Sequence, residues 1–521
     1  MRNSIAIVAL GCLVAVGAVS AQEASPQTGT SKSTLILTPE TQSSLIRLGG
    51  QMMLAGKAYE YDRELADEIG PRLTGSANYV RATEWATAEF TRLGLANVHK
   101  ESWTIPATWE PETLATARMI LPHEQRLHLE SEGWSPSTPE GGVRGDVLYV
   151  SDLQSATLTA SAGRIKGAIV LVDDTSLKSV ESKGLGLLFD GLDQIGAEGA
   201  KAILLGVGAT NDAPNMVGVT NFVGSIANVP VGNLGMEDTL LLKRLLERGG
   251  VASGGPDGKP ANYEPSEHEP VEVEFRFRNR IRENVAVNNV VAEIPGTDGS
   301  GDYVLIGGHL DSWHPGTGAQ DNGTGAASVV AVAEAIQASG LKPKRTMRFV
   351  LFGGEEEGTI GSIRYAEQHA GEMSKCVGVF VTDTGAEPPK GWYDFGRADE
   401  RDALNAIQPL LDSLGAGGVT TNGEYTFETD ESAFLVKGVP AFVLWTPVDK
   451  YMLLHHKPSD TFDKVNQRDL NLGAATVGVT AYAFANAANT LKHYSAKEVE
   501  DQLKAVDAYT QYQDLVAHKV L

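Results

Sequence analysis

The second half of the chain alternates short apolar runs with helical segments, and this order limits the folds it can adopt. The continuous apolar run at 303–306 is typical of a parallel strand that is covered on both faces, and the mainly apolar runs at 347–352 and 377–381 are predicted to be further strands. Helical patterns at 326–338 and 363–369 separate these runs. A further run follows at 441–445. This order predicts an α/β fold with a doubly wound, mostly parallel sheet.

Side chains that can bind a metal follow the ends of these apolar runs. In chain order they are His309, Asp321, Glu355, Glu356, Asp383 and His456. Because parallel strands of such a sheet end at one edge, where ligand sites form, we expect these side chains to lie close together. Imidazole and carboxylate groups are the ligands that zinc prefers in hydrolytic sites. The sequence therefore predicts a zinc site at this edge.

These segments resemble the two-zinc aminopeptidases and glutamate carboxypeptidases. The resemblance rests on five motifs in the family's order, namely Gly308-His309-Leu310-Asp311-Ser312, Gln320-Asp321-Asn322-Gly323, Glu355-Glu356, Thr382-Asp383 and His456-Lys457-Pro458-Ser459-Asp460. It extends over nearly all of the chain after the N-terminal segment. It implies the zinc exopeptidase fold and a zinc-dependent metallopeptidase.

The resemblance also implies which residues hold the metal ions. It gives Asp321 as the bridge between two zinc ions, His309 and Asp383 as further ligands of one ion, and Glu356 and His456 as further ligands of the other. Each ion then keeps an open position for the substrate carbonyl and for a shared hydroxide, the nucleophile. Co²⁺ or Mn²⁺ would accept the same nitrogen and oxygen ligands, so the native metal stays open.

Three more residues are candidates for catalytic roles. The resemblance implies that Glu355, next to a ligand, is the general base and acid. Asp311 stands two residues after His309, so both side chains project to the same side of an extended backbone. We expect Asp311 to accept the other imidazole N–H and fix its tautomer. His455 has two interpretations: a donor that steadies the oxyanion, or a plain core or surface histidine.

Other polar residues near the motifs have simpler interpretations. Asp460 is a candidate for orienting His456, as Asp311 does for His309. Asp430 is predicted to cap the following helix instead of contacting the site. Glu357 is predicted to be solvated or to support its neighbours. We expect His314 and His369 to be structural.

A different pattern interrupts the chain from about residue 141. Short strands are predicted at 147–150, 168–172 and 202–205, with a helix at 238–247 and a Gly/Pro-rich stretch at 249–260, and an alternating, half-buried strand at 271–277 marks the return to the first domain. The region resembles a β-rich protease-associated domain inserted into such a peptidase. We therefore predict this insert at 141–260, the two parts of the peptidase domain at 38–140 and 261–495, and a helical tail at 496–521.

The N-terminus has the pattern of an export signal at 1–21. Arg2 is followed by an uncharged apolar stretch at 5–19, and small residues lead to Ala21. A polar leader is predicted at 22–37. No later stretch is long and apolar enough to span a membrane. These features predict a periplasmic or secreted protein.

Composition excludes several classes of partner and site. The formal net charge of −23 argues against nucleic acid or an anionic membrane surface as a partner. The two cysteines exclude a Cys-rich zinc site. Cys12 lies in the export signal, so Cys376 is predicted to be unpaired. The chain also contains neither the Gly-x-Ser-x-Gly nor the His-Glu-x-x-His motif, which argues against common serine hydrolases and single-zinc proteases.

Several functions stay open on the sequence alone. The favoured hypothesis is an aminopeptidase or dipeptidase that hydrolyses short peptides, and carboxypeptidase specificity on the same site is the alternative. A glutaminyl cyclase normally holds one zinc, and receptor-like relatives lose metal ligands. The complete set of five ligands argues against both. A homodimer, the side-chain preference and the role of the insert are left open.

Overall fold

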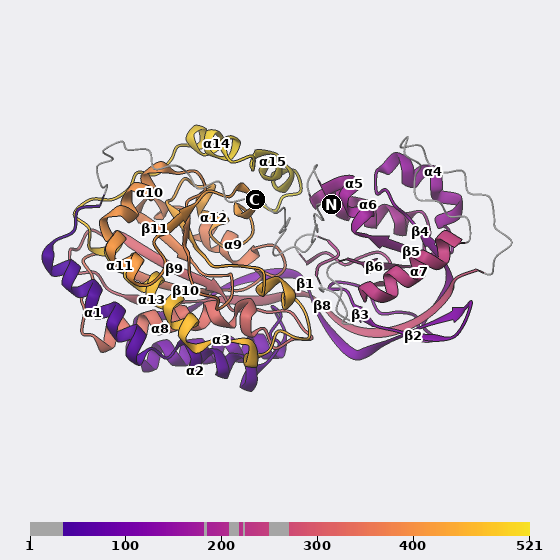
Figure 1. Ribbon diagram of the computed structural model, residues 1–521, viewed down its shortest axis with the longest axis horizontal. Helices are drawn as coiled ribbons and strands as arrows, with labels where there is room; N and C mark the ends of the chain where they lie inside the picture. Colours follow the sequence, from indigo (N-terminus) through magenta and orange to yellow (C-terminus); the bar gives the residue numbers. More distant parts are fainter. Residues whose placement is uncertain (1–34, 182–184, 208–217, 222–223, 249–269) are drawn as a thin grey trace. The chain divides into compact units, whose positions relative to one another are not determined.

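The computed structural model describes residues 35–181, 185–207, 218–221, 224–248 and 270–521 (Figure 1). Their contacts divide the chain into two compact units. The larger unit contains the described residues up to Thr104 and Ala286–Tyr509, and the smaller contains Ile105–Val285 and Thr510–Leu521. The predicted domain boundaries, at 38–140 and 261–495 for the peptidase domain, 141–260 for the insert and 496–521 for the tail, stay predictions.

The larger unit is built on a mostly parallel sheet. Its central strands are β9 (Tyr303–His309), β10 (Thr346–Phe352), β11 (Cys376–Val381) and β14 (Ala441–Trp445), in the order β14-β11-β9-β10. All three pairings between these neighbours are parallel, whereas the last residues of β8 (Glu272–Ile294) and the short β12 (Gly391–Tyr393) pair antiparallel at the two sides. The short strand β13 (Gly418–Thr420) pairs with β12. The predicted strands are therefore present.

Helices lie on both sides of this sheet (Figure 1). Helices α8 (Thr324–Ala338) and α13 (Gln467–Asn486) pack on its strands, and α1 (Pro39–Ala55) and α2 (Ala58–Arg63) pack on those helices. The remaining helices of this unit are α3 (Ala77–Arg92), α9 (Ile360–Gln368), α10 (Ala398–Leu404), α11 (Gln408–Ser413), α12 (Ser432–Leu435) and α14 (Ala496–Ala505). The predicted α/β class with a doubly wound sheet is confirmed.

Helix α3 illustrates how the sequence fixes these boundaries. The Ser76 side chain accepts a hydrogen bond from the Tyr79 N–H at 3.0 Å and so caps the first turn. The buried residues Tyr79, Ala82, Thr83, Ala86 and Phe90 recur every three or four positions, which is the spacing of one helix face. The break that the sequence predicts at 70–76 precedes this cap.

The smaller unit has its own strands and helices. Strands β4 (Val143–Tyr149), β5 (Ile169–Asp173), β6 (Ala202–Gly206) and β7 (Val231–Leu234) pair in that order, and all three pairings are parallel. Strand β3 (Leu129–Ser131) pairs antiparallel with β7, and β2 (Gln125–Leu127) pairs with β1 (Ala96–Leu121). Its helices are α4 (Ser155–Ile165), α5 (Asp174–Glu181), α6 (Leu185–Ala197), α7 (Met236–Arg248) and most of α15 (Tyr509–Ala517).

Two long strands were not expected at their observed length. Strand β1 has 26 residues and β8 has 23, and each contributes residues to both units. Within the smaller unit, Val273, Phe275 and Phe277 of β8 are buried at alternate positions. Ile105, Ala107 and Trp109 of β1 follow the same alternation. The alternation predicted at 271–277 therefore belongs to a much longer strand.

Three further predictions concern membrane-spanning helices, the pairing of Cys376 and the export signal. None of the described helices is long and apolar enough to cross a membrane. Cys376 is a buried free cysteine at the start of β11, as predicted. The export signal at 1–21, most of the leader at 22–37 and the Gly/Pro-rich stretch at 249–260 lie outside the described residues.

Candidate metal centre

The strand ends bring the predicted ligands to one edge of the sheet. His309 is the last residue of β9 and pairs with Phe352, the last residue of β10. Glu355 and Glu356 follow shortly after β10, and Asp383 follows shortly after β11. Because these three strands are parallel, their carboxyl ends lie together. The side chains that the sequence singles out are all buried, which places the cluster away from bulk water.

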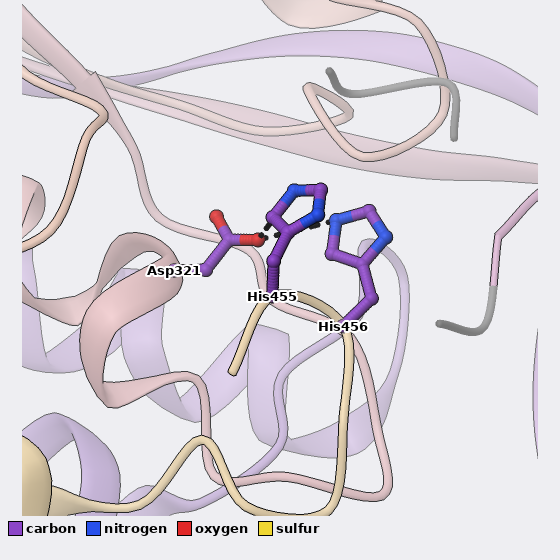
Figure 2. Close-up of side chains that lie close together, drawn as sticks. All are labelled: Asp321, His455 and His456. Carbon is purple, nitrogen blue, oxygen red and sulfur yellow. Dashed lines mark ion pairs between the residues drawn. The ribbon is translucent and has the colours of Figure 1, made fainter. Parts of the chain in front are cut away.

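Asp321 lies at the centre of the cluster (Figure 2). Its Oδ1 atom is 3.4 Å from Nε2 of His309. Its other oxygen, Oδ2, is 3.1 Å from Nε2 of His456 and 3.4 Å from Nε2 of His455. One oxygen of this carboxylate thus faces His309, and the other faces His455 and His456.

His309 and His456 each lie close to one further carboxylate. Nε2 of His309 is 3.1 Å from Oδ1 of Asp383. Nε2 of His456 is 3.0 Å from Oε2 of Glu356. Two sets of nitrogen and oxygen atoms therefore share Asp321, one around His309 and one around His456.

The donor atoms of this cluster fit a metal ion. Oδ2 of Asp321, Oε1 of Glu355 and Oε2 of Glu356 are buried, and no hydrogen-bond donor reaches them within the part of the chain that the structure describes. Buried carboxylate oxygens without donors are costly unless a cation compensates their charge. The nearest groups are imidazole nitrogens, which are themselves metal ligands.

The electrostatics of the cluster point the same way. Although burial acts in the opposite direction, the neighbouring imidazoles of His309, His456 and His455 hold the pKa of Asp321 well below its usual range. Burial raises the pKa of Glu356 to about 7, and the neighbouring charge of Asp321 adds to this shift. Burial also raises the pKa of Glu355 well above its usual range. So many acidic groups together require positive charge nearby.

Asp311 holds His309 from the side opposite the cluster. Nδ1 of His309 lies 3.1 Å from the Asp311 carbonyl oxygen and 3.4 Å from its Oδ1. Oδ2 of Asp311 accepts hydrogen bonds from Thr74 Oγ1 at 2.8 Å and from the Gly354 N–H at 3.0 Å. With a proton on Nδ1, Nε2 presents its lone pair to the cluster. This geometry is the one expected of a residue that fixes the tautomer.

Comparisons with known proteins agree with this geometry. Residues 289–481 match peptidase family M28. Over 448 residues the chain is 29% identical to carboxypeptidase Q of Mus musculus, which covers 86% of this chain and 89% of that protein. The crystal structure of a peptidase M28 precursor from Shewanella amazonensis SB2B superposes with a TM-score of 0.73 at 26% identity, over 88% of this chain and 98% of that one. The chain is similar to the zinc metallopeptidases of family M28.

The predicted family of zinc metallopeptidases and the predicted fold are therefore confirmed. A zinc aminopeptidase from Bacillus subtilis, called BSAP, also superposes on this chain. Its TM-score is 0.60 at 19% identity, over 82% of this chain and 94% of that one. At that level of identity the likeness shows a shared fold alone.

Two predictions about residues near the cluster are wrong. Asp460 does not orient His456: its Oδ1 accepts from the Gln320 N–H at 2.7 Å and its Oδ2 from the Asp321 N–H at 3.1 Å. It therefore holds the backbone of the Asp321 loop. Asp430 does not cap α12, because the capping position is Glu431 and no side chain bonds there. Glu357 is fully buried next to Asp311, which excludes the solvated interpretation and agrees with the other, a residue that supports its neighbours.

His455 and His369 lie in different surroundings. His455 is buried, and its ring stacks on that of His456 with 3.8 Å between the ring centres. This excludes a surface histidine but leaves its catalytic role a prediction. His369 lies outside the cluster, with hydrogen bonds to Glu101 and Glu372, as a structural residue would.

Arg72 is the residue that sequence reasoning missed. It is fully buried, and its guanidinium donates to three backbone carbonyls: Leu310 at 2.7 Å, Thr317 at 2.9 Å and Gly318 at 2.9 Å. These carbonyls belong to the segment that connects His309 to Asp321. The only signal in the sequence is a charged residue between Pro71 and Leu73, and it does not say which carbonyls are bound.

We expect Arg72→Lys to destabilise the protein by about 3 kcal/mol, because lysine cannot reach three carbonyls with one ammonium and buried acceptors lose their donors. The midpoint of urea unfolding, measured in chelator so that metal binding does not contribute, checks this. Exposed Arg81 gives the matched control, and Arg81→Lys should change stability by no more than ~0.5 kcal/mol. Equal midpoints for the two variants would contradict the role of Arg72.

Proposed function

We propose that this protein is an exported dizinc exopeptidase that removes residues from short peptides, as an aminopeptidase or dipeptidase. The observation that carries this proposal is the position of Asp321, whose Oδ1 faces His309 and whose Oδ2 faces His456. A carboxylate in that position can bridge two cations. Buried imidazole and carboxylate ligands without thiolates suit zinc. The zinc aminopeptidase that shares the fold is consistent with this choice.

The distances support one assignment of the ligands. His309 and Asp383 would hold one ion, Glu356 and His456 the other, and Asp321 both. His455 also approaches Asp321, but His456 additionally contacts Glu356 at 3.0 Å. We therefore assign His456 to the metal and His455 to the substrate side, where its N–H would donate to the oxyanion. Bound zinc would supply Lewis-acid chemistry, which lowers the pKa of water and polarises a carbonyl.

Glu355 would move the proton. Its Oε2 lies 3.8 Å from Nε2 of His309, and no donor within the described residues reaches its Oε1. The side chain is therefore close to the metal ligands without being satisfied by the protein. It would take a proton from the attacking water and pass it to the nitrogen of the leaving amine. Asp311 would keep His309 in one orientation throughout.

The charges around the centre favour a free amino terminus over a carboxylate as the recognised end of the peptide. Buried Asp430 and Glu431 lie near Asp383, so a substrate ammonium would be stabilised there and a carboxylate repelled. The guanidinium of Arg72 is already bound to carbonyls. Lys457, buried beside His456, is the cation that a carboxypeptidase would need.

Metal content and substrate preference, measured together, test the proposal. We expect about two zinc ions per chain, cleavage of free dipeptides that a chelator abolishes, and no cleavage of N-acetylated peptides. Recovery of the protein outside the cytoplasm, with Gln22 as its first residue, would support export. Its mass in solution would decide between monomer and homodimer.

The opposite outcomes identify the alternatives. Cleavage of N-acetylated peptides, with a KM that rises in Lys457→Met, would make the protein a carboxypeptidase. One zinc per chain with cyclisation of N-terminal glutamine would indicate a glutaminyl cyclase. No bound metal would indicate a receptor-like binding protein.

A further inference from the structure

A buried threonine from the first part of the chain joins two of the segments that carry the proposed site. Thr74 lies in the loop before α3 and is fully buried. Its Oγ1 donates to Oδ2 of Asp311 at 2.8 Å and accepts from the Gly354 N–H at 2.7 Å. Asp311 follows β9 and Gly354 follows β10, so one hydroxyl connects the carboxyl ends of two neighbouring strands.

The Gly354 N–H holds the start of the segment that contains Glu355 and Glu356. This N–H is shared between Oγ1 of Thr74 at 2.7 Å and Oδ2 of Asp311 at 3.0 Å. Gly354 has a φ of 71°, in the left-handed region that favours glycine, and the chain turns there toward Glu355. Because Glu355 is the next residue, a rotation of this peptide would move its side chain. The hydrogen bonds at Gly354 therefore restrict where the proposed base can lie.

The carboxylate of Asp311 connects the same segment to His309. Its Oδ1 lies 3.4 Å from Nδ1 of His309, while its Oδ2 accepts from Thr74 and Gly354. The Glu356 N–H also faces Oδ2, at 3.4 Å. Loss of the Thr74 hydroxyl would remove the shortest of these hydrogen bonds. Because a buried carboxylate requires its donors, it would then shift toward the N–H groups that remain and change its position against His309.

The loop that carries Thr74 is itself held in place. The Arg72 N–H donates to Oγ of Ser312 at 3.2 Å, in addition to the hydrogen bonds from its guanidinium to three carbonyls. Two residues after Thr74, the Ser76 side chain caps α3. The hydroxyl of Thr74 therefore has a fixed position from which it holds its two partners.

We propose that Thr74 is a positioning residue for the reaction, whose hydroxyl sets the place of the base Glu355 relative to His309. This inference rests on the proposed function. It gives Thr74 no contact with the substrate or a metal ion. Without the hydroxyl, proton transfer should slow while substrate binding is unchanged, so kcat falls and KM stays constant.

Substitutions at Thr74 in the full chain test this role. We expect Thr74→Val and Thr74→Ala, which both lack the hydroxyl, to lower kcat on a free dipeptide by about 10–100-fold at unchanged KM. Thr74→Ser keeps the hydroxyl and should stay within a few-fold of wild type. The matched control is Thr83→Val, which should keep the kcat of wild type. Thr83 is also buried, and its hydroxyl donates to the Val80 carbonyl oxygen within α3 at 2.8 Å.

The visible spectrum of the cobalt-substituted protein gives a readout besides activity. Co²⁺ accepts the same nitrogen and oxygen ligands as zinc, and its absorption bands depend on ligand geometry. We expect the bands of Thr74→Val to differ from those of wild type, because His309 changes its orientation. The bands of Thr74→Ser and Thr83→Val should match wild type.

Two results would overturn the role of Thr74. One is wild-type kcat in Thr74→Val, and the other is an equal fall of kcat in Thr74→Ser, which retains the hydroxyl. A wild-type protein that binds no metal and cleaves no peptide would instead overturn the proposed function. The failures of the two proposals are therefore distinguishable.

Discussion

Replacing Glu355 by glutamine should lower kcat by about 10²–10⁴-fold while zinc content and fold stay unchanged. Glutamine keeps the size of the side chain but cannot accept and return a proton. Within the described residues no hydrogen-bond donor reaches Oε1 of Glu355. The substitution therefore breaks no hydrogen bond there and leaves the proposed metal ligands in place. Initial rates on a free dipeptide, with zinc counted in the same samples, check the expectation.

The neighbouring Glu357 provides the control. It is also fully buried, and burial raises its pKa well above its usual range, with further contributions from the charges of Asp311 and Glu356. Glu357 has no proposed part in the proton transfer, so Glu357→Gln should change kcat by only a few-fold. Retained activity in Glu355→Gln would remove the proton-transfer role. Lost zinc in that variant would instead make Glu355 a ligand.

The position of the site could be predicted because parallel strands leave a clear pattern. Strand β9 is buried on both faces and begins in the sequence as a continuous apolar run, and β10 ends in the buried apolar run Phe349-Val350-Leu351-Phe352. The residue types that follow a run are then assigned to one sheet edge. His309 and Asp383 required no further information to be placed together.

The contacts between polar residues could not be predicted in the same way. Asp460 stands four residues from His456, and that spacing suggested a local partner. In the fold the backbone N–H groups of Gln320 and Asp321 bind it instead. The carbonyls that Arg72 binds are equally distant in the chain. Such partners depend on how loops from different segments meet, and a single sequence carries no periodic signal for that.

Strand β1 escaped prediction for a different reason. It contains Pro106 and Pro111, and proline argues against a strand because it cannot donate a ladder hydrogen bond. Strand β1 lies off the main path of the sheet and pairs with β2 and β8. The sequence analysis therefore assigned no strand here.

Replacing Asp321 by asparagine should weaken metal binding more than any change outside the ligand set. The variant offers one neutral carbonyl oxygen where two charged oxygens now face His309 and His456. Changes to partners behind a metal ligand typically cost 10–100-fold in affinity, so loss of the bridge should raise the Kd for zinc by more than about 100-fold. Titration with a fluorescent zinc chelator measures this.

Asp460→Asn separates the bridge from its support. Asp460 binds the Asp321 N–H and not the metal, so its loss should fall within the 10–100-fold range, with both ions still binding at high zinc. If Asp321 bridges, Asp321→Asn must affect both ions together, because its two oxygens face His309 and His456. Loss of a single ion, with the second bound as in wild type, would place Asp321 on one metal and leave the two sites independent.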